Sequence, residues 1–370
     1  MRVAIIGSRG YPYVYSGYET FVRELSERLV HRGFQVTVYC HRNLFSARPP
    51  RVNGVDLVYL PTFERKVLSQ FVHSIQSMLH ASLRVRPQII LAVNAANGPF
   101  GIISRLFRRR SAINVDGLEW LRPKWRGLGA RYFHWGARLA TRWYDAVITD
   151  SREMQAIYRR EFGCDSDCIA YGAVVPPPRS PNTIREWGLA PRGYYLVVGR
   201  LVPDNNGDLL VREFLASEST KRLVIVGDVP YHDAYAERLR KIDDPRVLFI
   251  GYVRDPGVLD ELYQHCFAYL HGHEFGGTNP TLLTALACGC AVGALDTAFS
   301  QEVLAGEEYG RYFDKQPGSL GRLLGEMERD PVALERVRAQ APQRIRQCYT
   351  WERITDQYVD LFHRLEGEGR

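Results

Sequence analysis

Short apolar runs rich in β-branched residues alternate with helical patterns along this chain, and the alternation constrains its fold more than any other feature. The first half holds strand-length runs at 3–7, 35–40, 55–60, 89–94, 112–117, 145–150 and 168–173. Between the first two runs, Phe21, Leu25 and Leu29 share one helical face, and Gly33 can cap the helix. Strands separated by helices predict a doubly wound parallel sheet.

A proline-rich segment, PPPRSPN at 176–182, divides the chain. Proline fixes φ and lacks an N–H, so consecutive prolines continue neither a helix nor a sheet ladder. The strand pattern resumes with runs at 194–200, 222–228, 247–253, 266–272 and 290–296. We therefore expect a first domain over 1–175, a linker over 176–182, a second domain of the same architecture over 183–350, and an amphipathic helix with a polar tail over 351–370.

The charge of the chain favours an anionic partner. The 370 residues carry a net charge of +7, but residues 1–175 hold 25 Lys and Arg against 13 Asp and Glu, so only the first half is basic. This asymmetry fits an anionic membrane surface or a phosphorylated acceptor better than nucleic acid, and its densest patch is Leu106–Ser111. The first ten residues lack the apolar segment of a signal peptide. We expect a cytoplasmic protein, peripheral at the inner face of the plasma membrane.

The stretch Gly7–Thr20, GSRGYPYVYSGYET, leads from a strand into a helix. Its glycines, Gly7, Gly10 and Gly17, match neither a Rossmann fingerprint nor a Walker loop, which argues against ordinary NAD or ATP chemistry. Free N–H groups at the start of the following helix could receive an anion. A plain strand-to-helix turn accounts for the same residues.

The stretch 271–289, HGHEFGGTNPTLLTALACG, predicts a phosphate-binding helix start. A strand ends in the loop HEFGG, Asn279 is placed as the N-cap, and Pro280 is placed as the first helical residue. The N–H groups of Thr281–Leu283 would then be unpaired at the positive end of the helix dipole. A diphosphate suits that position, and Glu274 is placed to accept hydrogen bonds from sugar hydroxyls.

Other polar residues also follow predicted strands. Arg200 ends YYLVVGR, where a bidentate bond to phosphate is one interpretation and a surface ion pair is the other. Asn205 in the VPDNN loop is either a neutral donor or a turn former. Asp116 and Glu119 in INVDGLEW could bind acceptor hydroxyls, with helix capping as the alternative for Asp116. No His and Cys cluster has metal spacing, so we predict no metal and no cofactor.

In these segments the chain resembles the GT-B glycosyltransferases of the retaining family 4 type, and more narrowly the bacterial polysaccharide rhamnosyltransferases. The resemblance spans nearly the whole chain, through IIGSRGYPYVYSGYETFV, INVDGLEWLRPKW, IAYGA, VGRLVPDNN, GHEFGGTNPTLL and the SQEV at 300–303. It implies two Rossmann-like domains facing a cleft, with the last helix crossing back to the first domain. The segments GHEFGGTNP and DGLEW argue against a sugar-nucleotide epimerase of the same fold.

The family's chemistry implies metal-independent transfer of a hexosyl unit with retention of configuration. The donor would be a nucleoside-diphosphate sugar, with dTDP-L-rhamnose favoured, and the acceptor a glycan or a lipid-linked sugar in cell-envelope polysaccharide assembly. The resemblance assigns catalytic roles to Arg200 on the diphosphate and Glu274 on the donor sugar. Asp116 and Glu119 would bind the acceptor. The donor site would contain Gly17, Asn205, Gly276, Gly277, Thr278, Asn279, Thr281, Leu282, Leu283 and Thr284.

Three positions depart from the family pattern. Ser16 precedes Gly17 where two glycines are usual, and the Lys common after the phosphate-binding Arg is absent, although the rhamnosyltransferase branch favours Asn there. Related helices also carry a Glu, typically on the nucleotide ribose, where this chain has Thr284. A Thr makes one hydrogen bond where a carboxylate clasps two hydroxyls. A weakened or inactive sugar-nucleotide-binding relative is therefore the alternative function.

Overall fold

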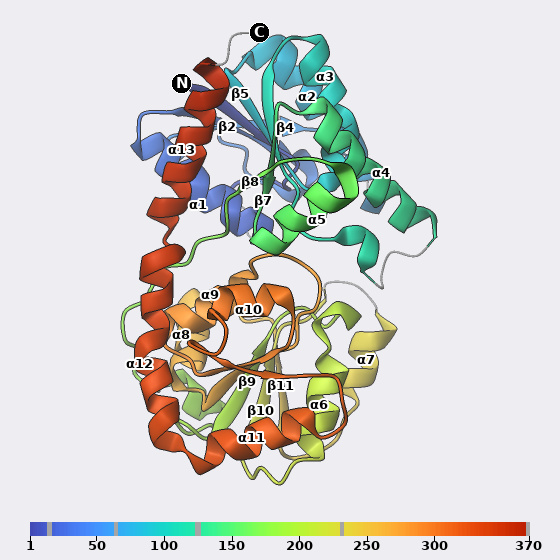
Figure 1. Cartoon of the computed structure of the whole chain (residues 1–370). Helices are drawn as coiled ribbons and strands as arrows, with labels where there is room; N and C mark the ends of the chain where they lie inside the picture. Colours follow the sequence, from blue (N-terminus) through green and yellow to red (C-terminus); the bar gives the residue numbers. More distant parts are fainter. Residues whose placement is uncertain (13–16, 63–65, 123–126, 230–232, 368–370) are drawn as a thin grey trace. The chain divides into compact units, whose positions relative to one another are not determined.

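The computed structural model describes residues 1–12, 17–62, 66–122, 127–229 and 233–367 (Figure 1). Its contacts divide the chain into two compact units. The first consists of Met1–Leu121, Trp125–Tyr171 and Trp351–Arg370, and the second of Arg122–Lys124 and Gly172–Thr350. Within the described ranges, no helix combines the length and the apolar character needed to cross a bilayer.

The first unit contains an eight-stranded sheet in the order β3-β4-β2-β1-β5-β6-β7-β8. Its strands are β1 Arg2–Ile6, β2 Gln35–His41, β3 Arg51–Val52, β4 Val55–Leu60, β5 Ile89–Val93, β6 Arg110–Asn114, β7 Ala146–Thr149 and β8 Asp167–Cys168. Val3 in β1 is paired with Val36 on one side and with Ile89 on the other, both in parallel register. The predicted parallel sheet is confirmed, except that β3 runs antiparallel to β4. Strand β3 was not predicted, because two residues are too few to show an alternating apolar pattern.

Two layers of helices flank this sheet. The helices are α1 Gly17–His31, α2 Lys66–His80, the π-helical η2 Ala81–Val85, α3 Gly101–Leu106, α4 Leu128–Trp143, α5 Arg152–Phe162 and α13 Trp351–Gly367, with short 3-10 turns η1 Arg42–Leu44, η3 Ala95–Phe100 and η4 Glu119–Leu121. Helices α1 and α13 pack together on one face, and α2, α3 and α4 pack on the other (Figure 1).

The C-terminal helix α13 completes the first unit, as the resemblance predicted. The rings of Phe21 in α1 and Tyr358 in α13 are 5.5 Å apart. The Tyr358 hydroxyl accepts a hydrogen bond of 2.9 Å from Asn114 Nδ2 at the end of β6. Arg32 in α1 forms an ion pair of 2.7 Å with Asp356. The last helix therefore contributes both apolar and polar contacts to a sheet built from the first half of the chain.

The second unit contains a six-stranded sheet, all of it parallel, in the order β11-β10-β9-β12-β13-β14. Its strands are β9 Tyr194–Val198, β10 Arg222–Val226, β11 Val247–Gly251, β12 Ala268–His271, β13 Val292–Leu295 and β14 Arg311–Phe313. Five of these strands lie within the predicted runs. The short strand β14 was not predicted, because its charged first residue breaks the apolar pattern.

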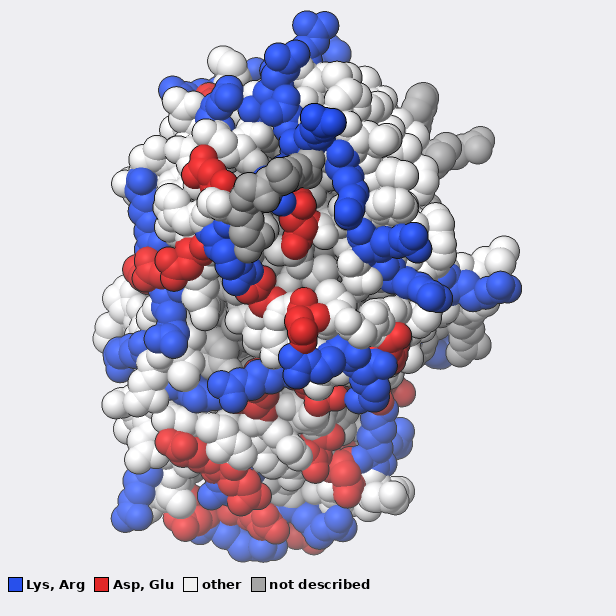
Figure 2. Space-filling model, turned by 45° about the horizontal axis from the view of Figure 1, so that its top comes forward, with Lys and Arg blue, Asp and Glu red and all other residues white. Residues whose placement is uncertain are grey.

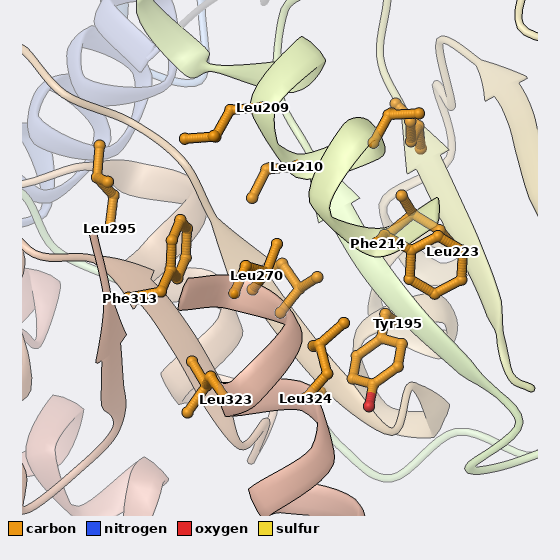
Figure 3. Packing of buried hydrophobic residues seen from close by; sticks show 14 of the residues in the cluster. Tyr195, Leu209, Leu210, Phe214, Leu223, Leu270, Leu295, Phe313, Leu323 and Leu324 are labelled. Atoms are coloured by element: carbon orange, nitrogen blue, oxygen red, sulfur yellow. The ribbon is translucent and has the colours of Figure 1, made fainter. Parts of the chain in front are cut away.

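Helices cover both faces of this sheet. They are α6 Gly207–Leu215, α7 Ala234–Arg240, α8 Pro256–His265, α9 Pro280–Ala287, α10 Ala298–Leu304, α11 Ser319–Arg329 and α12 Pro331–Cys348, with turns η5 Thr183–Trp187 and η6 Pro203–Asn205. Figure 3 shows Phe214 of α6 and Leu324 of α11 converging on Tyr195, Leu223 and Leu270 of the sheet. All five side chains are at most 1% exposed. This core fixes the strands whose ends carry the predicted site residues.

In both sheets the chain adds strands first on one side of a central strand and then on its other side. In the first unit the chain places β2 on one side of β1 and β5 on the other, and in the second unit it places β10 and β12 on opposite sides of β9. At such a switch point the loops after two neighbouring parallel strands diverge, which leaves space at the carboxyl edge of the sheet. Open α/β sheets bind their ligands at such positions.

A buried pair of histidines lies in the first unit. The rings of His41, which ends β2, and His73 in α2 are stacked with their centroids 3.9 Å apart, and His73 is fully buried. Within the described residues, His41 Nε2 and both ring nitrogens of His73 lack hydrogen-bond partners. Burial lowers the pKa of His41 to about 3, with help from His73 and Arg9, and it lowers the pKa of His73 to about 4. The fold thus favours two neutral imidazoles.

This pair makes the stability of the first unit dependent on pH. An unfolded His titrates near pH 6.5, so below that pH the unfolded chain binds protons that the folded chain excludes. Stability is then full above about pH 6.5 and falls toward pH 4, by up to about 1.4 kcal/mol per pH unit for each His. In urea unfolding, the substitution His73→Phe should flatten this dependence, whereas the exposed-site control His31→Gln should leave it unchanged. Equal pH slopes for His73→Phe and the unsubstituted chain would contradict the argument.

Candidate functional site

A surface pocket lies at the switch point of the second sheet, where β9 and β12 end. Its lining includes Gly199, Arg200, Asn205, His271, Gly272 and His273. Gly272 is required by the close packing of the two loops, since a Cβ on it would lie 2.5 Å from the Asn205 carbonyl oxygen. The β9 and β12 loops therefore touch at their bases, and the structure brings the predicted Arg200 and Asn205 together with the start of HGHEFGG.

Arg200 is an exposed cation at this pocket. It makes no ion pair with any described residue, so the surface ion pair considered from the sequence is not observed there. Asn205 donates from Nδ2 to the Arg200 carbonyl oxygen over 2.8 Å, which closes the turn between them. Its Oδ1 is buried and has no partner among the described residues. Asn205 is thus a turn former, and its amide donor is already engaged.

Glu274 is held by two donors. Its Oε2 is 2.6 Å from Lys315 Nζ and accepts a longer hydrogen bond of 3.4 Å from Asn206 Nδ2. Asn206 also donates over 2.8 Å to the carbonyl oxygen of Gly272, which ties it to the same loop. Lys315 was missed by sequence reasoning because it follows β14, the strand that has no apolar pattern. The residue assigned to the donor sugar is therefore already oriented by a cation.

The predicted helix start at α9 is confirmed, but its N–H groups are not all free. Asn279 is the N-cap, and its Oδ1 accepts from Thr281 N over 3.0 Å and from Thr281 Oγ1 over 2.8 Å. Leu283 N donates to the Asn279 carbonyl oxygen over 3.1 Å. The expectation of unpaired N–H groups was wrong for Thr281, where the cap side chain occupies the position expected for an anion. It was also wrong for Leu283, whose N–H group makes the first backbone hydrogen bond of the helix. An anion at Thr281 would have to displace the Asn279 amide.

The loop before α9 is tightly enclosed. Gly276 has φ +128°, a conformation that favours glycine, while Gly277 and Thr278 are buried. Farther along the helix, the Thr284 hydroxyl donates to the Pro280 carbonyl oxygen over 2.9 Å. Its proton is therefore used within the helix, and the hydroxyl oxygen remains as an acceptor. Thr284 offers less to a ribose than the two oxygens of a carboxylate.

His271 and His273 lie parallel at the pocket. Their rings are 5.7 Å apart with an interplanar angle of 13°, and Tyr269 OH is 3.2 Å from His271 Nδ1. Burial lowers the pKa of His271 to about 3, so its ring is neutral at physiological pH. Within the described residues, no cluster of three or more His, Cys, Asp or Glu side chains has an arrangement suited to a metal ion.

A buried charge pair supports the β9 loop. Asp204, only 1% exposed, lies with its Oδ2 3.8 Å from Nε of Arg122, which its contacts assign to the second unit. The Asp204 carbonyl oxygen accepts from Glu274 N over 3.1 Å. Removing one partner of a buried ion pair typically costs about 3–5 kcal/mol. Sequence reasoning did not assign Arg122, although it lies two residues from the end of the INVDGLEW segment.

In the first unit, the acidic segment lies beside the first helix. The Asp116 carboxylate accepts from Tyr171 OH over 2.7 Å, and its carbonyl oxygen accepts from Tyr18 OH over 3.1 Å. Burial and the nearby Asp116 raise the pKa of Tyr171 well above its usual value. Glu119, within η4, is only 7% exposed. Gly17 begins α1, and Ser16 lies outside the described residues. Asp116 is the more accessible of the two predicted acceptor carboxylates.

Comparison with protein families is consistent across both units. Residues 16–172 match the family described as "Glycosyl transferase 4-like domain". Residues 192–326 match "Glycosyl transferases group 1". Together these two matches cover most of the chain and describe glycosyltransferase domains, and the two parallel-sheet units have the GT-B fold. Nothing in these matches specifies a donor sugar or the stereochemistry of transfer.

Solved structures show the same fold at low sequence identity. The chain is similar to sucrose-phosphate synthase from Thermosynechococcus elongatus, with a TM-score of 0.83 and 17% identity over 100% of each chain. It is also similar to Anabaena HepE in complex with UDP-glucose, with a TM-score of 0.76 and 16% identity over 98% of this chain and 100% of that one.

One curated relative matches part of the chain. It is N-acetylgalactosamine-N,N'-diacetylbacillosaminyl-diphospho-undecaprenol 4-alpha-N-acetylgalactosaminyltransferase from Campylobacter jejuni, 27% identical over 119 residues. The match covers 32% of this chain and 32% of that protein, so it spans about a third of either length. Its name also describes a glycosyltransferase, in agreement with the two domain matches.

The cap at α9 can be tested directly. The substitution Asn279→Ala should destabilise the second unit by about 1 kcal/mol, because Thr281 N loses its side-chain acceptor at the start of the helix. The substitution Asn279→Ser keeps an oxygen that can cap and should retain most of that stability. Urea unfolding at neutral pH measures both variants. If Asn279→Ala and Asn279→Ser prove equally stable, the side chain of Asn279 has no capping role.

Proposed function

We propose that this chain is a retaining, metal-independent glycosyltransferase that moves a hexosyl unit, with L-rhamnosyl favoured, from a nucleoside-diphosphate sugar to a glycan or lipid-linked acceptor in polysaccharide assembly. The observation that carries the proposal is the pocket at the β9–β12 switch point, with the exposed Arg200, the oriented Glu274 and the start of α9 around one edge of the sheet. That edge is where open α/β sheets bind nucleotides.

The proposed chemistry needs a site that binds a diphosphate and stabilises its departure. Arg200 would bind the phosphate oxygens with two parallel hydrogen bonds and offset the charge that develops as the sugar–oxygen bond breaks. The positive end of α9 would add to this, once Asn279 gives way to the ligand. Glu274 would accept hydrogen bonds from donor-sugar hydroxyls. The acceptor hydroxyl would attack from the face that the diphosphate leaves, which retains the anomeric configuration and requires no protein nucleophile.

The first unit would bind the acceptor, with Asp116 and Glu119 close to its hydroxyls. A lipid-linked acceptor is supported by the Campylobacter jejuni relative, whose name specifies a diphospho-undecaprenol-linked sugar as the group glycosylated. A nucleoside-diphosphate sugar donor is supported by HepE, which was solved with UDP-glucose. The proposal includes a cytoplasmic location and peripheral contact of the basic first unit with the plasma membrane.

The presence of Thr284, where related chains carry a Glu, bears on which nucleotide the site would prefer. A carboxylate at this position would clasp the two adjacent hydroxyls of a ribose, but the deoxyribose of a dTDP-sugar carries only one of them. A single acceptor oxygen, which is what Thr284 offers after bonding to Pro280, is then sufficient. This reasoning favours dTDP-L-rhamnose over a UDP-sugar.

A second candidate function rests on the same residue. If the ribose contact at Thr284 is too weak for any nucleotide, the chain is a weakened or inactive sugar-nucleotide-binding relative. Titration of dTDP-L-rhamnose, UDP-glucose and GDP-mannose, followed by turnover with an extract of lipid-linked acceptors, distinguishes the two functions. Turnover of a donor supports the transferase. Binding without hydrolysis or transfer of any donor supports the alternative.

Arg200 is the first residue to test. The substitution Arg200→Ala should weaken donor binding at least about a hundredfold, because two charge-assisted hydrogen bonds to phosphate are lost, worth about 1.5–3 kcal/mol each. The exposed residue Arg336 in α12 offers a matched control, since Arg336→Ala removes the same charge from the same unit. Isothermal titration with dTDP measures both variants. An unchanged dissociation constant for Arg200→Ala would remove Arg200 from the donor site.

Thr284→Glu tests the nucleotide argument. We expect tighter binding of UDP, by about tenfold for one additional hydrogen bond of about 1.4 kcal/mol, and little change for dUDP, which lacks the second hydroxyl but keeps the base. The control is Thr284→Gln, because Gln has nearly the size and helix propensity of Glu but carries no charge. Equal gains for UDP and dUDP, or no gain for either, would show that a carboxylate at residue 284 does not bind the second ribose hydroxyl.

A further inference from the structure

A group of neighbouring helices in the first unit carries no acidic residue. Helices α2, η2, α3 and α4, together with the turn η3, contain no Asp or Glu. Their outer surface and the segments that directly follow them carry exposed arginines, namely Arg84, Arg105, Arg108, Arg131, Arg138 and Arg142. Within the described part of the chain, none of these six guanidinium groups forms an ion pair with a carboxylate. Figure 2 shows a continuous run of Lys and Arg side chains in its upper right, on the side where Figure 1 places α3 and α4.

Arginines of α1 and α13, on the other face of the same sheet, form ion pairs with carboxylates. Arg28 in α1 is paired with Glu24, Arg32 in α1 with Asp356, and Arg364 in α13 with Asp167, at 2.6–2.7 Å. Genome-wide preference for arginine would affect both layers alike. The lack of carboxylate partners is therefore particular to the arginines of α2, η2, α3 and α4, and does not follow from the arginine content of the chain.

Large apolar side chains are exposed among the unpaired arginines. Leu128 is 81% exposed and Trp135 is 51% exposed on the outer face of α4. Leu106 at the end of α3 is 73% exposed, and Ile102, Phe107 and Leu83 are also exposed. In α4 the two apolar residues lie among cations along one face, in the order Leu128, Arg131, Trp135, Arg138, Arg142. An outer face of this kind, with Trp and Leu among cations, is typical of helices that lie in a membrane interface.

Direct contacts show that these residues belong to one surface. The Arg105 guanidinium in α3 donates to the Arg142 carbonyl oxygen in α4 over 3.0 Å. The rings of Tyr132 and Trp135 are 6.1 Å apart, and Tyr132 in turn lies 6.3 Å from Phe71 in α2. Helix α3 also packs against both α2 and α4. The cations and the apolar side chains can therefore meet one partner at the same time.

We propose that the outer surface of α2, η2, α3 and α4 is a docking face for an anionic lipid bilayer, with Trp135, Leu128 and Leu106 entering the interface and the arginines binding lipid phosphates. The inference deepens the proposed function and rests on it, because a lipid-linked acceptor would be met at such a surface. Unpaired cations supply the attraction to anionic headgroups, and the exposed apolar side chains supply the insertion.

A bilayer fits this surface better than a nucleic acid does. Phosphate recognition on a duplex uses Arg and Lys but leaves exposed Leu and Ile side chains without a partner. Membrane interfaces, by contrast, favour Trp and aliphatic side chains beside cations. The two partners also differ in a measurable way, since only insertion transfers Trp135 into an apolar medium.

Vesicle co-sedimentation of the full chain tests the proposal. We expect binding to vesicles of equal parts phosphatidylcholine and phosphatidylglycerol, with little binding to phosphatidylcholine alone. The triple substitution Arg131→Gln, Arg138→Gln and Arg142→Gln should weaken partitioning at least tenfold, because each cation near an anionic surface strengthens binding about fivefold. Gln keeps the helix propensity of Arg. The matched control is Arg152→Gln, Arg159→Gln and Arg160→Gln on α5, which changes the net charge of the same unit equally.

Trp135 reports whether the face inserts. Tryptophan emission should shift to shorter wavelength when mixed vesicles are added, and Trp135→Phe should abolish most of that shift. Equal weakening by the two triple variants would overturn the proposal, because it would indicate a response to net charge alone. The proposal would also be overturned if the unsubstituted chain bound double-stranded RNA, the α4 triple variant did not, and vesicles caused no emission shift. That result would identify a nucleic-acid surface. Neither measurement uses donor or acceptor, so the transferase proposal stands or fails separately.

Discussion

The change of direction in the second sheet is the constraint on which the candidate site depends. Strand β9 is central, and the chain adds β10 and β11 on one side before it returns to add β12, β13 and β14 on the other. The loops after β9 and β12 must therefore diverge, and Arg200 and His271–Glu274 fall on the two sides of that divergence. Gly272 allows the two loops to touch at their bases, since any larger residue would collide with Asn205. Sheet topology thus positions residues that are far apart in the sequence.

Much of this arrangement could be predicted because its determinants are local. Apolar runs of five or six residues identify β9, β10 and β12, and an Asn-Pro pair before an apolar segment identifies the start of α9. Arg200 and Asn279 could be located for that reason, one at a strand end and the other at a helix cap. The same local patterns located α13, whose apolar residues recur at helical spacing.

The remainder depends on tertiary contacts that no local pattern encodes. Lys315 reaches Glu274 from beyond a three-residue strand, and Arg122 reaches Asp204 across more than eighty positions of sequence. The side chain of Asn279 competes with a ligand for Thr281 N, and sequence alone does not say which of the two wins. Likewise, a count of charges reveals that the first half is basic but does not reveal which arginines are paired with carboxylates.

The return of α13 to the first unit ties the folding of that unit to the far end of the chain. The sheet of the first unit leaves the ribosome long before Tyr358, whose ring packs on Phe21 and whose hydroxyl accepts from Asn114. Until residues 351–367 have been synthesised, Phe21 and the end of β6 lack a partner that fully buries them. A fragment that ends at the proline-rich segment would expose the side chains that α13 covers, and α13 supplied as a separate peptide should bind to them. Nascent chains of this protein must therefore complete the second unit before the first can reach its final packing.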